Sequence, residues 1–278
     1  LDLEPVTGDK SYTEVLPQFN LVYKTGDDSQ LRAAVTRGLA RPNFEDMAPW
    51  RLLNLEDMEI ELGNPDLDVT TAWNFDLMWE QYLQPLGIIS AGVFYKDLTD
   101  YIFFYNVDEV VDGEEFEIIQ PRNGDKGNLF GIELAYQNNF TSWPGFWGGF
   151  GLYANYTYVD SEAKYPDREA GTLPGQAENV GNIAISYEKY RISTRLSYNF
   201  NGKNILEVGD DPEEDIWVDD HTQLDFLLRV QVSERFSILL EAINITDEPY
   251  TVFEGVSDRI RQQEYYGWWA TLGVRFDL

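Results

Sequence analysis

Residues 268–278 read Trp268-Trp269-Ala270-Thr271-Leu272-Gly273-Val274-Arg275-Phe276-Asp277-Leu278. Alternate positions of this stretch are apolar, and they are Trp268, Ala270, Leu272, Val274, Phe276 and Leu278. The positions between them are Trp269, Thr271, Gly273, Arg275 and Asp277. Because successive side chains of a β-strand point to opposite faces, this period of two predicts a strand with one apolar and one polar face.

Eleven segments of this kind can be placed along the chain. Their expected ranges are roughly 12–24, 30–40, 69–83, 87–103, 126–139, 148–160, 179–188, 191–201, 222–232, 235–245 and 265–278. Short and long connections alternate between them, and the long ones are 41–68, 104–125, 161–178, 202–221 and 246–264. Short turns at one end and long loops at the other are typical of a transmembrane β-barrel. We therefore predict an all-β, antiparallel transmembrane barrel with every long loop at the same rim.

The composition agrees with a barrel and excludes other classes of protein. Aromatic residues make up 15% of the chain, and its 17 tyrosines and eight tryptophans suit a membrane–water boundary. The mean hydropathy of −0.38 and the lack of an 18-residue apolar stretch exclude a helical membrane span. The net charge of −29 argues against nucleic acid as a partner, because phosphates would be repelled.

The sequence offers no cofactor or metal site and no catalytic motif. It has no cysteine, and His221 is its only histidine, so neither a thiolate site nor a histidine pair can form. The acidic run Asp210–Asp215 lacks the glycine and the closing glutamate of a calcium loop. We expect that run to be a solvated, mobile loop. No phosphate loop, dinucleotide fingerprint or nucleophile elbow is present. A barrel enzyme such as an outer-membrane lipase or protease would need a nucleophile or an acid pair at the rim, and no spacing in the sequence singles one out, so we do not expect an enzyme.

Single charges within the predicted strands determine which face points outward. In segment 222–232 the polar positions are Asp225, Arg229 and Gln231, and they alternate with apolar positions. A cation facing lipid at mid-membrane would cost about 2–4 kcal/mol, so the polar positions must face the lumen. By the same argument we predict that four further charged side chains face the lumen, and these are Glu133, Arg195, Glu241 and Arg275. Such residues either pair with one another, with a plug or with water, or line the route of a substrate.

Eleven strands do not form a complete barrel of the bacterial kind, whose strand number is even. An unpaired edge in lipid would leave backbone donors and acceptors without hydrogen bonds. The chain starts with Leu1-Asp2-Leu3-Glu4, which has neither Met nor the basic start and apolar core of a signal peptide. We expect a processed chain or a piece of a longer one, with the segments 12–24 and 265–278 as the two edges of the sheet.

Several motifs resemble one known family. The middle of that family's barrels is resembled by two stretches taken together, Tyr12-Thr13-Glu14-Val15-Leu16-Pro17 and the segment 31–44 that follows it. Gly63-Asn64-Pro65-Asp66-Leu67, Asn74-Phe75-Asp76-Leu77 and Gly92-Val93-Phe94-Tyr95-Lys96-Asp97 repeat its loop–strand–turn–strand pattern, and Asn244-Ile245-Thr246-Asp247-Glu248-Pro249-Tyr250 resembles its closing hairpin. By their order and spacing the chain resembles the TonB-dependent outer-membrane receptors. The resemblance implies a 22-stranded barrel filled by a plug, of which residues 1–278 would be the C-terminal part.

The resemblance also implies a function. The protein would lie in the bacterial cell outer membrane, contact its lipid, and take up a small-molecule nutrient with energy from the TonB complex. The plug and the TonB-binding segment would lie outside residues 1–278. The ligand is expected to be a carbohydrate or a ferric siderophore, and a passive porin-like or structural barrel is the alternative. Candidate ligand-binding residues lie in the outer loops and the lumen, and they are Trp50, Trp217, Tyr265, Arg195, Arg229 and Glu241.

Overall fold

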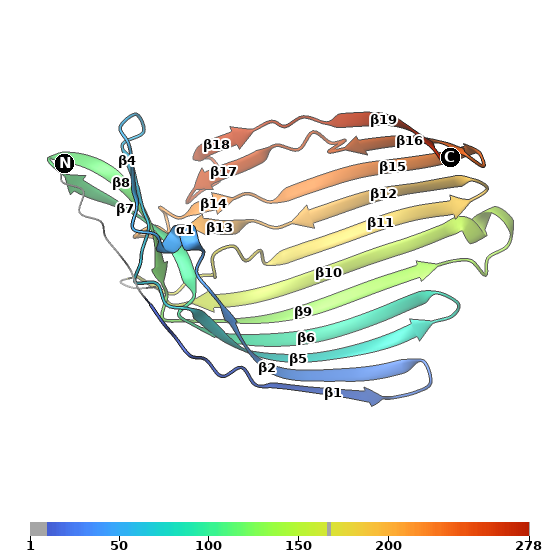
Figure 1. The fold of residues 1–278 in the computed structure, drawn as a ribbon, viewed down its shortest axis with the longest axis horizontal. Coiled ribbons are helices and arrows are strands. Elements are labelled where there is room, and N and C mark those ends of the chain that lie inside the picture. The colour runs from blue at the N-terminus through green and yellow to red at the C-terminus, as the bar shows by residue number, and fades with distance from the viewer. Residues whose placement is uncertain (1–9, 166–167, 278) are drawn as a thin grey trace.

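The computed structural model describes residues 10–165 and 168–277. Its main feature is a curved antiparallel sheet of eleven strands (Figure 1). In order across the sheet these are β1 (Gln18–Lys24), β2 (Ser29–Ala40), β5 (Thr70–Leu83), β6 (Gly87–Thr99), β9 (Lys126–Asn139), β10 (Phe150–Ala163), β11 (Asn179–Lys189), β12 (Ile192–Asn201), β15 (His221–Ser233), β16 (Phe236–Ile243) and β19 (Trp269–Phe276). No helix in the described part of the chain is long and apolar enough to cross a membrane.

All eleven predicted strands are confirmed, with differences at their ends. The first strand begins at Gln18 and not at residue 12, directly after Pro17, which has no N–H to donate to a ladder. The last strand begins at Trp269 and not at residue 265, because its partner β16 ends at Ile243 opposite Trp269. Across the described residues, β1 and β19 are the two edges of the sheet and do not pair with each other.

The predicted alternation of faces is also confirmed, because apolar positions lie in register across neighbouring strands. Leu240 pairs with Leu272 and Ile238 with Val274, so the apolar positions of β16 and β19 share one face. On the other face, Arg195 of β12 pairs with Leu227 of β15. We call the face with Leu240 and Leu272 the outer face, and the face with Arg195 and Leu227 the inner face.

The short turns lie at one end of the sheet and the long connections at the other, as predicted (Figure 1). The turn 140–149 contains a short 3₁₀ segment, η1 (Gly145–Gly149), and a group of aromatic rings. The ring of Phe146 lies 4.8 Å from that of Tyr187 and 5.4 Å from that of Phe150. Lys189 Nζ donates to the carbonyl of Gly145 at 2.5 Å. That these rings anchor the turn at a membrane interface stays a prediction.

The five long connections are not loops alone, which corrects the sequence-based expectation. They contain α1 (Phe44–Met47) and two four-stranded sheets, and we call them together the cap (41–69, 100–125, 164–178, 202–220 and 244–268). One sheet is formed by β3 (Arg51–Asn54), β4 (Glu59–Leu62), β8 (Glu114–Asn123) and β7 (Ile102–Val111). The other is formed by β13 (Asn204–Glu207), β14 (Ile216–Val218), β17 (Tyr250–Glu254) and β18 (Ile260–Glu264). The pairing of β4 with β8 is parallel, whereas every other pair of strands in the described residues is antiparallel.

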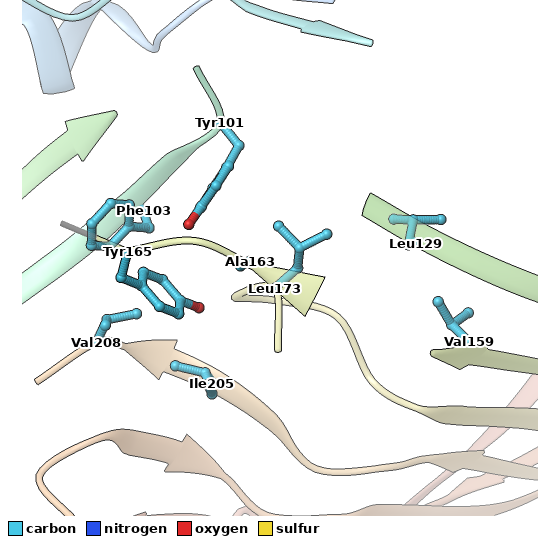
Figure 2. Packing of buried hydrophobic residues seen from close by; sticks show 9 residues of the cluster. All are labelled: Tyr101, Phe103, Leu129, Val159, Ala163, Tyr165, Leu173, Ile205 and Val208. Carbon is cyan, nitrogen blue, oxygen red and sulfur yellow. The ribbon is translucent and has the colours of Figure 1, made fainter. Parts of the chain in front are cut away.

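A hydrophobic core joins the cap to the rim of the main sheet (Figure 2). Its members come from β7, β9, β10, β13 and the segments next to them, and they are Tyr101, Phe103, Leu129, Val159, Ala163, Tyr165, Leu173, Ile205 and Val208. The rings of Phe103 and Tyr165 meet edge to face at 5.2 Å, a favourable aromatic geometry. Tyr101 donates its hydroxyl hydrogen to the carbonyl of Lys164 at 2.9 Å, and the hydroxyl of this buried side chain therefore has a hydrogen-bond partner. The cap is therefore a packed layer and not a set of independent loops.

Candidate functional site

Three cavities open between the connections of the cap. The first has a volume of about 440 Å³ and is lined by Tyr101, Phe104 and the segment 173–176. The second, of about 280 Å³, lies between Asn106, Glu117 and Arg261. The third measures about 470 Å³ and has Trp217 and Lys203 in its wall. A ligand arriving from the long-loop side would meet these hollows before the inner face of the sheet.

The second cavity is built around a bidentate ion pair. Arg261 Nη1 and Nη2, from β18, each donate to one carboxylate oxygen of Glu117, from β8, at 2.7 Å. These hydrogen bonds from Arg261 lower the pKa of Glu117. The side-chain amide of Asn106 donates to Glu117 at 2.5 Å and to Glu207 at 3.3 Å. Burial, together with the nearby charge of Glu117, raises the pKa of Glu207.

A second ion pair lies deeper, between two connections of the cap. Arg168 Nη1 and Nη2 donate to the two carboxylate oxygens of Asp215 at 2.6 and 3.0 Å. The side chains are 5% and 3% exposed, respectively. The run Asp210–Asp215 is thus not a uniformly solvated, mobile loop, because its last residue is fixed in the interior. No group of three or more His, Cys, Asp or Glu side chains in the described ranges could hold a metal ion.

Trp217 lies in the wall of the third cavity, and its contact with a ligand stays a prediction. It lies in β14, and its ring stacks on that of Phe253 with a centroid distance of 6.4 Å and an interplanar angle of 7°. The ammonium group of Lys203 lies 5.2 Å from the centroid of the Trp217 ring. Strand pairing fixes the stack, because Trp217 and Phe253 are direct partners of β14 and β17. A flat aromatic surface with a cation beside it is thus presented to the third cavity.

Trp50 and Tyr265 lie elsewhere in the cap, outside the three cavities described above. Trp50 Nε1 donates to the carbonyl of Glu45 at 2.7 Å, which holds the indole against α1. Tyr265 is 69% exposed, and its hydroxyl donates to Gln263 at 3.0 Å. The three predicted aromatic residues are therefore not brought together, and a ligand contact by Trp50, Trp217 or Tyr265 stays a prediction.

Arg195 lies on the inner face of β12, as expected. Its Nε donates to Ser197 at 3.0 Å, and its guanidinium lies 5.8 Å from the centroid of the Tyr153 ring. Arg195 and Tyr153 border a cavity of about 580 Å³ on the inner face, which Gln137 and Leu227 also line. Among the ion pairs of the described residues, none includes Arg195.

Arg229 and Glu241 share the inner face with Arg195 but do not pair with it. Arg229 Nη2 lies 3.5 Å from the hydroxyl of Ser237. Glu241 stands opposite Leu227 on one side and Thr271 on the other. Within the described part of the chain neither forms an ion pair, so the expected pairing among inner-face charges does not include them. Their role toward a ligand or a plug is untested and stays a prediction.

Sequence reasoning missed the residues that organise the cap, although one signal was available. Asp112-Gly113 lies between two segments that each contain β-branched and aromatic residues, 102–111 and 114–123, and both turn residues have positive φ, 54° and 91°. Asp-Gly between alternating strands is a strong hairpin signal. The pairs Arg168–Asp215 and Arg261–Glu117 join residues 47 and 144 positions apart, so no local pattern could reveal them.

The comparisons with known proteins agree with this architecture. The family model "TonB dependent receptor-like, beta-barrel" matches residues 2–245. No curated protein matches the chain. The siderophore receptor PirA from Acinetobacter baumannii is similar, with a TM-score of 0.65 and 16% identity over 95% of this chain and 41% of its own. The ferric yersiniabactin uptake receptor FyuA from Yersinia pestis is also similar, with a TM-score of 0.63 and 18% identity over 95% of this chain and 37% of its own.

A third similar structure is the ferric enterobactin receptor mutant R480A of Pseudomonas aeruginosa in complex with enterobactin, with a TM-score of 0.60 and 14% identity over 94% of this chain and 40% of its own. At these identities the likeness establishes the fold alone. The chain spans about two fifths of the length of these receptors. The family model, in contrast, covers most of the chain. The chain therefore belongs to the TonB-dependent receptor β-barrel family.

Proposed function

We propose that this barrel segment serves in an outer-membrane receptor that binds a ferric siderophore from the medium and imports it with energy supplied through TonB. Family membership across residues 2–245 is the observation that carries the proposal. The similar solved structures favour a siderophore over a carbohydrate, because their names specify siderophore, ferric enterobactin and ferric yersiniabactin receptors. Under this proposal the protein lies in the bacterial outer membrane and acts as a transporter and not as an enzyme.

The cap supports this function through its position and its cavities. In the third cavity a chelate would meet the Trp217 ring and the ammonium group of Lys203. Arg195, Arg229 and Glu241 line the inner face farther along the proposed route. A passive pore made of this sheet alone would need β1 to pair with β19, and the described residues do not form that pairing. In the intact protein we expect each edge to pair with a further strand, because backbone groups in lipid must be hydrogen-bonded.

The proposal is tested by uptake in cells. The full-length protein is expressed in a Gram-negative host that lacks its own siderophore receptors, and radioactive iron is supplied as ferric hydroxamate or ferric catecholate chelates. We expect uptake of at least one chelate that disappears when the host's TonB is deleted. Diffusion of small solutes without TonB, and no iron uptake with it, would favour the passive pore.

A further inference from the structure

The buried pair Arg168–Asp215 is the most enclosed charged group of the described cap. Its two hydrogen bonds, at 2.6 and 3.0 Å, fix both the distance and the plane of the guanidinium relative to the carboxylate. Arg168 Nη1 also donates to the carbonyl of Gly209 at 2.7 Å, and the Gly209 amide donates to Asp215 at 3.0 Å. The connections 164–178 and 202–220 are thereby held in one relative orientation.

Backbone bonds near Asp215 join two more connections to this point. The Gly255 amide, from 244–268, donates to the carbonyl of Asp215 at 2.8 Å. On the other side, the Val208 amide donates to the carbonyl of Phe104, and the Asn106 amide donates to the carbonyl of Val208, each at 2.9 Å. Four of the five connections of the cap therefore meet within a few residues of the ion pair.

Each of the three cap cavities has part of its wall in the segments joined in this way. The first cavity is lined by 173–176, which follows Arg168 in the same connection. The second is lined by Gly209 and Glu214, the immediate neighbours of the pair. The third has Gln176 and Trp217 in its wall, one from each connection that the pair joins. Moving the connection of Arg168 relative to that of Asp215 would change the shape of every one of them.

An apolar contact could hold the two connections together as well as this pair does. Removing two charges from water is costly, and well-packed apolar residues often replace a buried ion pair without loss of stability. The bidentate pair also fixes the relative orientation of the two connections, because a guanidinium and a carboxylate form their two parallel hydrogen bonds only when they lie in one plane. We propose that Asp215, through Arg168, is a positioning residue that sets the cavity walls of the cap before a ligand arrives. Binding to a preformed surface avoids the cost of ordering it.

This inference rests on the proposed function in one respect, namely that the chelate binds in the cap. The test compares the full-length protein with the variant Asp215→Asn in detergent, by hydrogen exchange without ligand and by affinity for the ferric chelate that the uptake assay identifies. Glu213→Gln is the matched control, because Glu213 is exposed and belongs to the same acidic run. We expect Asp215→Asn to raise exchange at least about tenfold in 168–178, 205–216 and 250–256, since breaking a buried pair is strongly destabilising. The main sheet and the control should not change.

A second variant perturbs the same junction without changing its charge. Gly255 has φ +61°, and an added Cβ would lie 2.2 Å from the carbonyl oxygen of Glu213. Gly255→Ala should therefore raise exchange in the same three segments. If exchange rises only next to each substituted residue, the four connections are not joined through Asp215 and the inference fails.

Positioning is separated from simple packing by an apolar double variant, Arg168→Met with Asp215→Leu. Compared with Asp215→Asn, we expect this variant to regain much of the protection from exchange. Its affinity for the chelate should stay about tenfold below that of the parent protein, because an apolar contact does not fix the relative orientation of the two connections. Recovery of the full affinity would show that the pair only fills space, and would overturn the inference. Should the parent protein bind no ferric chelate, the proposed function fails, whereas the exchange data still decide whether the cap is joined through Asp215.

Discussion

Glu117 and Glu207 carry the same side chain, yet their pKa values are shifted in opposite directions. Arg261 donates two hydrogen bonds to Glu117 and lowers its pKa. Glu207 has only a shared amide of Asn106, and burial raises its pKa. The hydrogen bonds from Arg261 to Glu117 and the burial of Glu207 therefore decide that Glu207 is protonated first on acidification.

The opposite shifts predict a maximum in the stability of the cap at mildly acidic pH. Between the raised pKa of Glu207 and the ordinary glutamate value, the folded state takes up a proton before the unfolded state does, so stability rises as pH falls. The contribution of Glu117 is complete above the ordinary value and is lost as pH falls through its lowered pKa. Glu207→Gln should reduce the rise, to which the raised pKa of the neighbouring Glu59 also contributes, and keep the loss. Hydrogen exchange of 114–123 against pH measures both, with the exposed Glu109→Gln as control; a rise of unchanged size in Glu207→Gln would contradict the assignment.

Among single residues, those placed by strand alternation were the predictable ones. Arg195 and Arg229 face inward because apolar neighbours on β12 and β15, namely Leu196, Leu228 and Val230, face outward. The interior position of Asp215 could not be predicted, because its partner Arg168 comes from another connection and local composition suggested only a solvated acidic run. Trp50 and Tyr265 show that an exposed or interfacial aromatic residue in a loop is not placed by residue type alone.

At the scale of elements, the hairpin β7–β8 depends on its two-residue turn. Gly113 has φ +91°, a conformation that L side chains rarely adopt, and no atom lies within 4 Å of the position a Cβ would occupy. Gly113→Ala should therefore destabilise the hairpin by about 1 kcal/mol through backbone strain alone. Asp112→Gly is the control, because glycine is suited to the positive φ at that position. Hydrogen exchange of 102–123 should increase in the alanine variant only; equal exchange in both would show that the turn does not limit the hairpin.

The strand β9 offers a direct test of the two faces of the main sheet. Leu134 lies on the outer face opposite Ala91, and its neighbour Ala135 lies on the inner face opposite Ser90. Leu134→Arg should cost up to about 2–4 kcal/mol if this position is near mid-membrane, whereas Ala135→Arg places the same charge in the lumen. Unfolding by denaturant in lipid vesicles measures the difference. Equal losses of stability in the two variants would contradict the assignment of the faces.

At the scale of the whole molecule, charge is concentrated in the cap. Its five connections contain 32 acidic and eight basic residues, a net charge of −24 out of the −29 of the chain. Such a field raises the local concentration of cations and repels polyanions, over a distance of about 30 Å at 0.01 M salt and about 8 Å at 0.15 M.

If the ligand is a ferric chelate, its charge should decide how binding responds to salt. We expect the association rate of a cationic complex to fall between 0.01 and 0.15 M salt, that of a triply anionic catecholate complex to rise, and that of a neutral one to stay constant. Stopped-flow fluorescence on the full-length protein, with three chelates of different charge, measures these slopes. Three equal slopes would show that the cap does not steer its ligand by charge.

The main sheet could be predicted from sequence because each of its strands has one apolar and one polar face, and this produces a local alternation of residue types that can be recognised strand by strand. The sheets of the cap are different, because β4, β13 and β14 have only three or four residues each, and β4 and β14 each pair with a strand of another connection, β8 and β17. Their arrangement depends on contacts that exist only after the main sheet has brought the connections together.

The parallel pairing of β4 with β8 determines the order in which the molecule can assemble. The two strands are joined through β5, β6 and β7, so the chain crosses the main sheet twice before β8 can meet β4. Closing such a separation early would cost entropy without any compensating contacts. We therefore expect the two crossings to form first and the β4–β8 ladder to form as a late step. Its formation would report that this part of the barrel has already folded correctly.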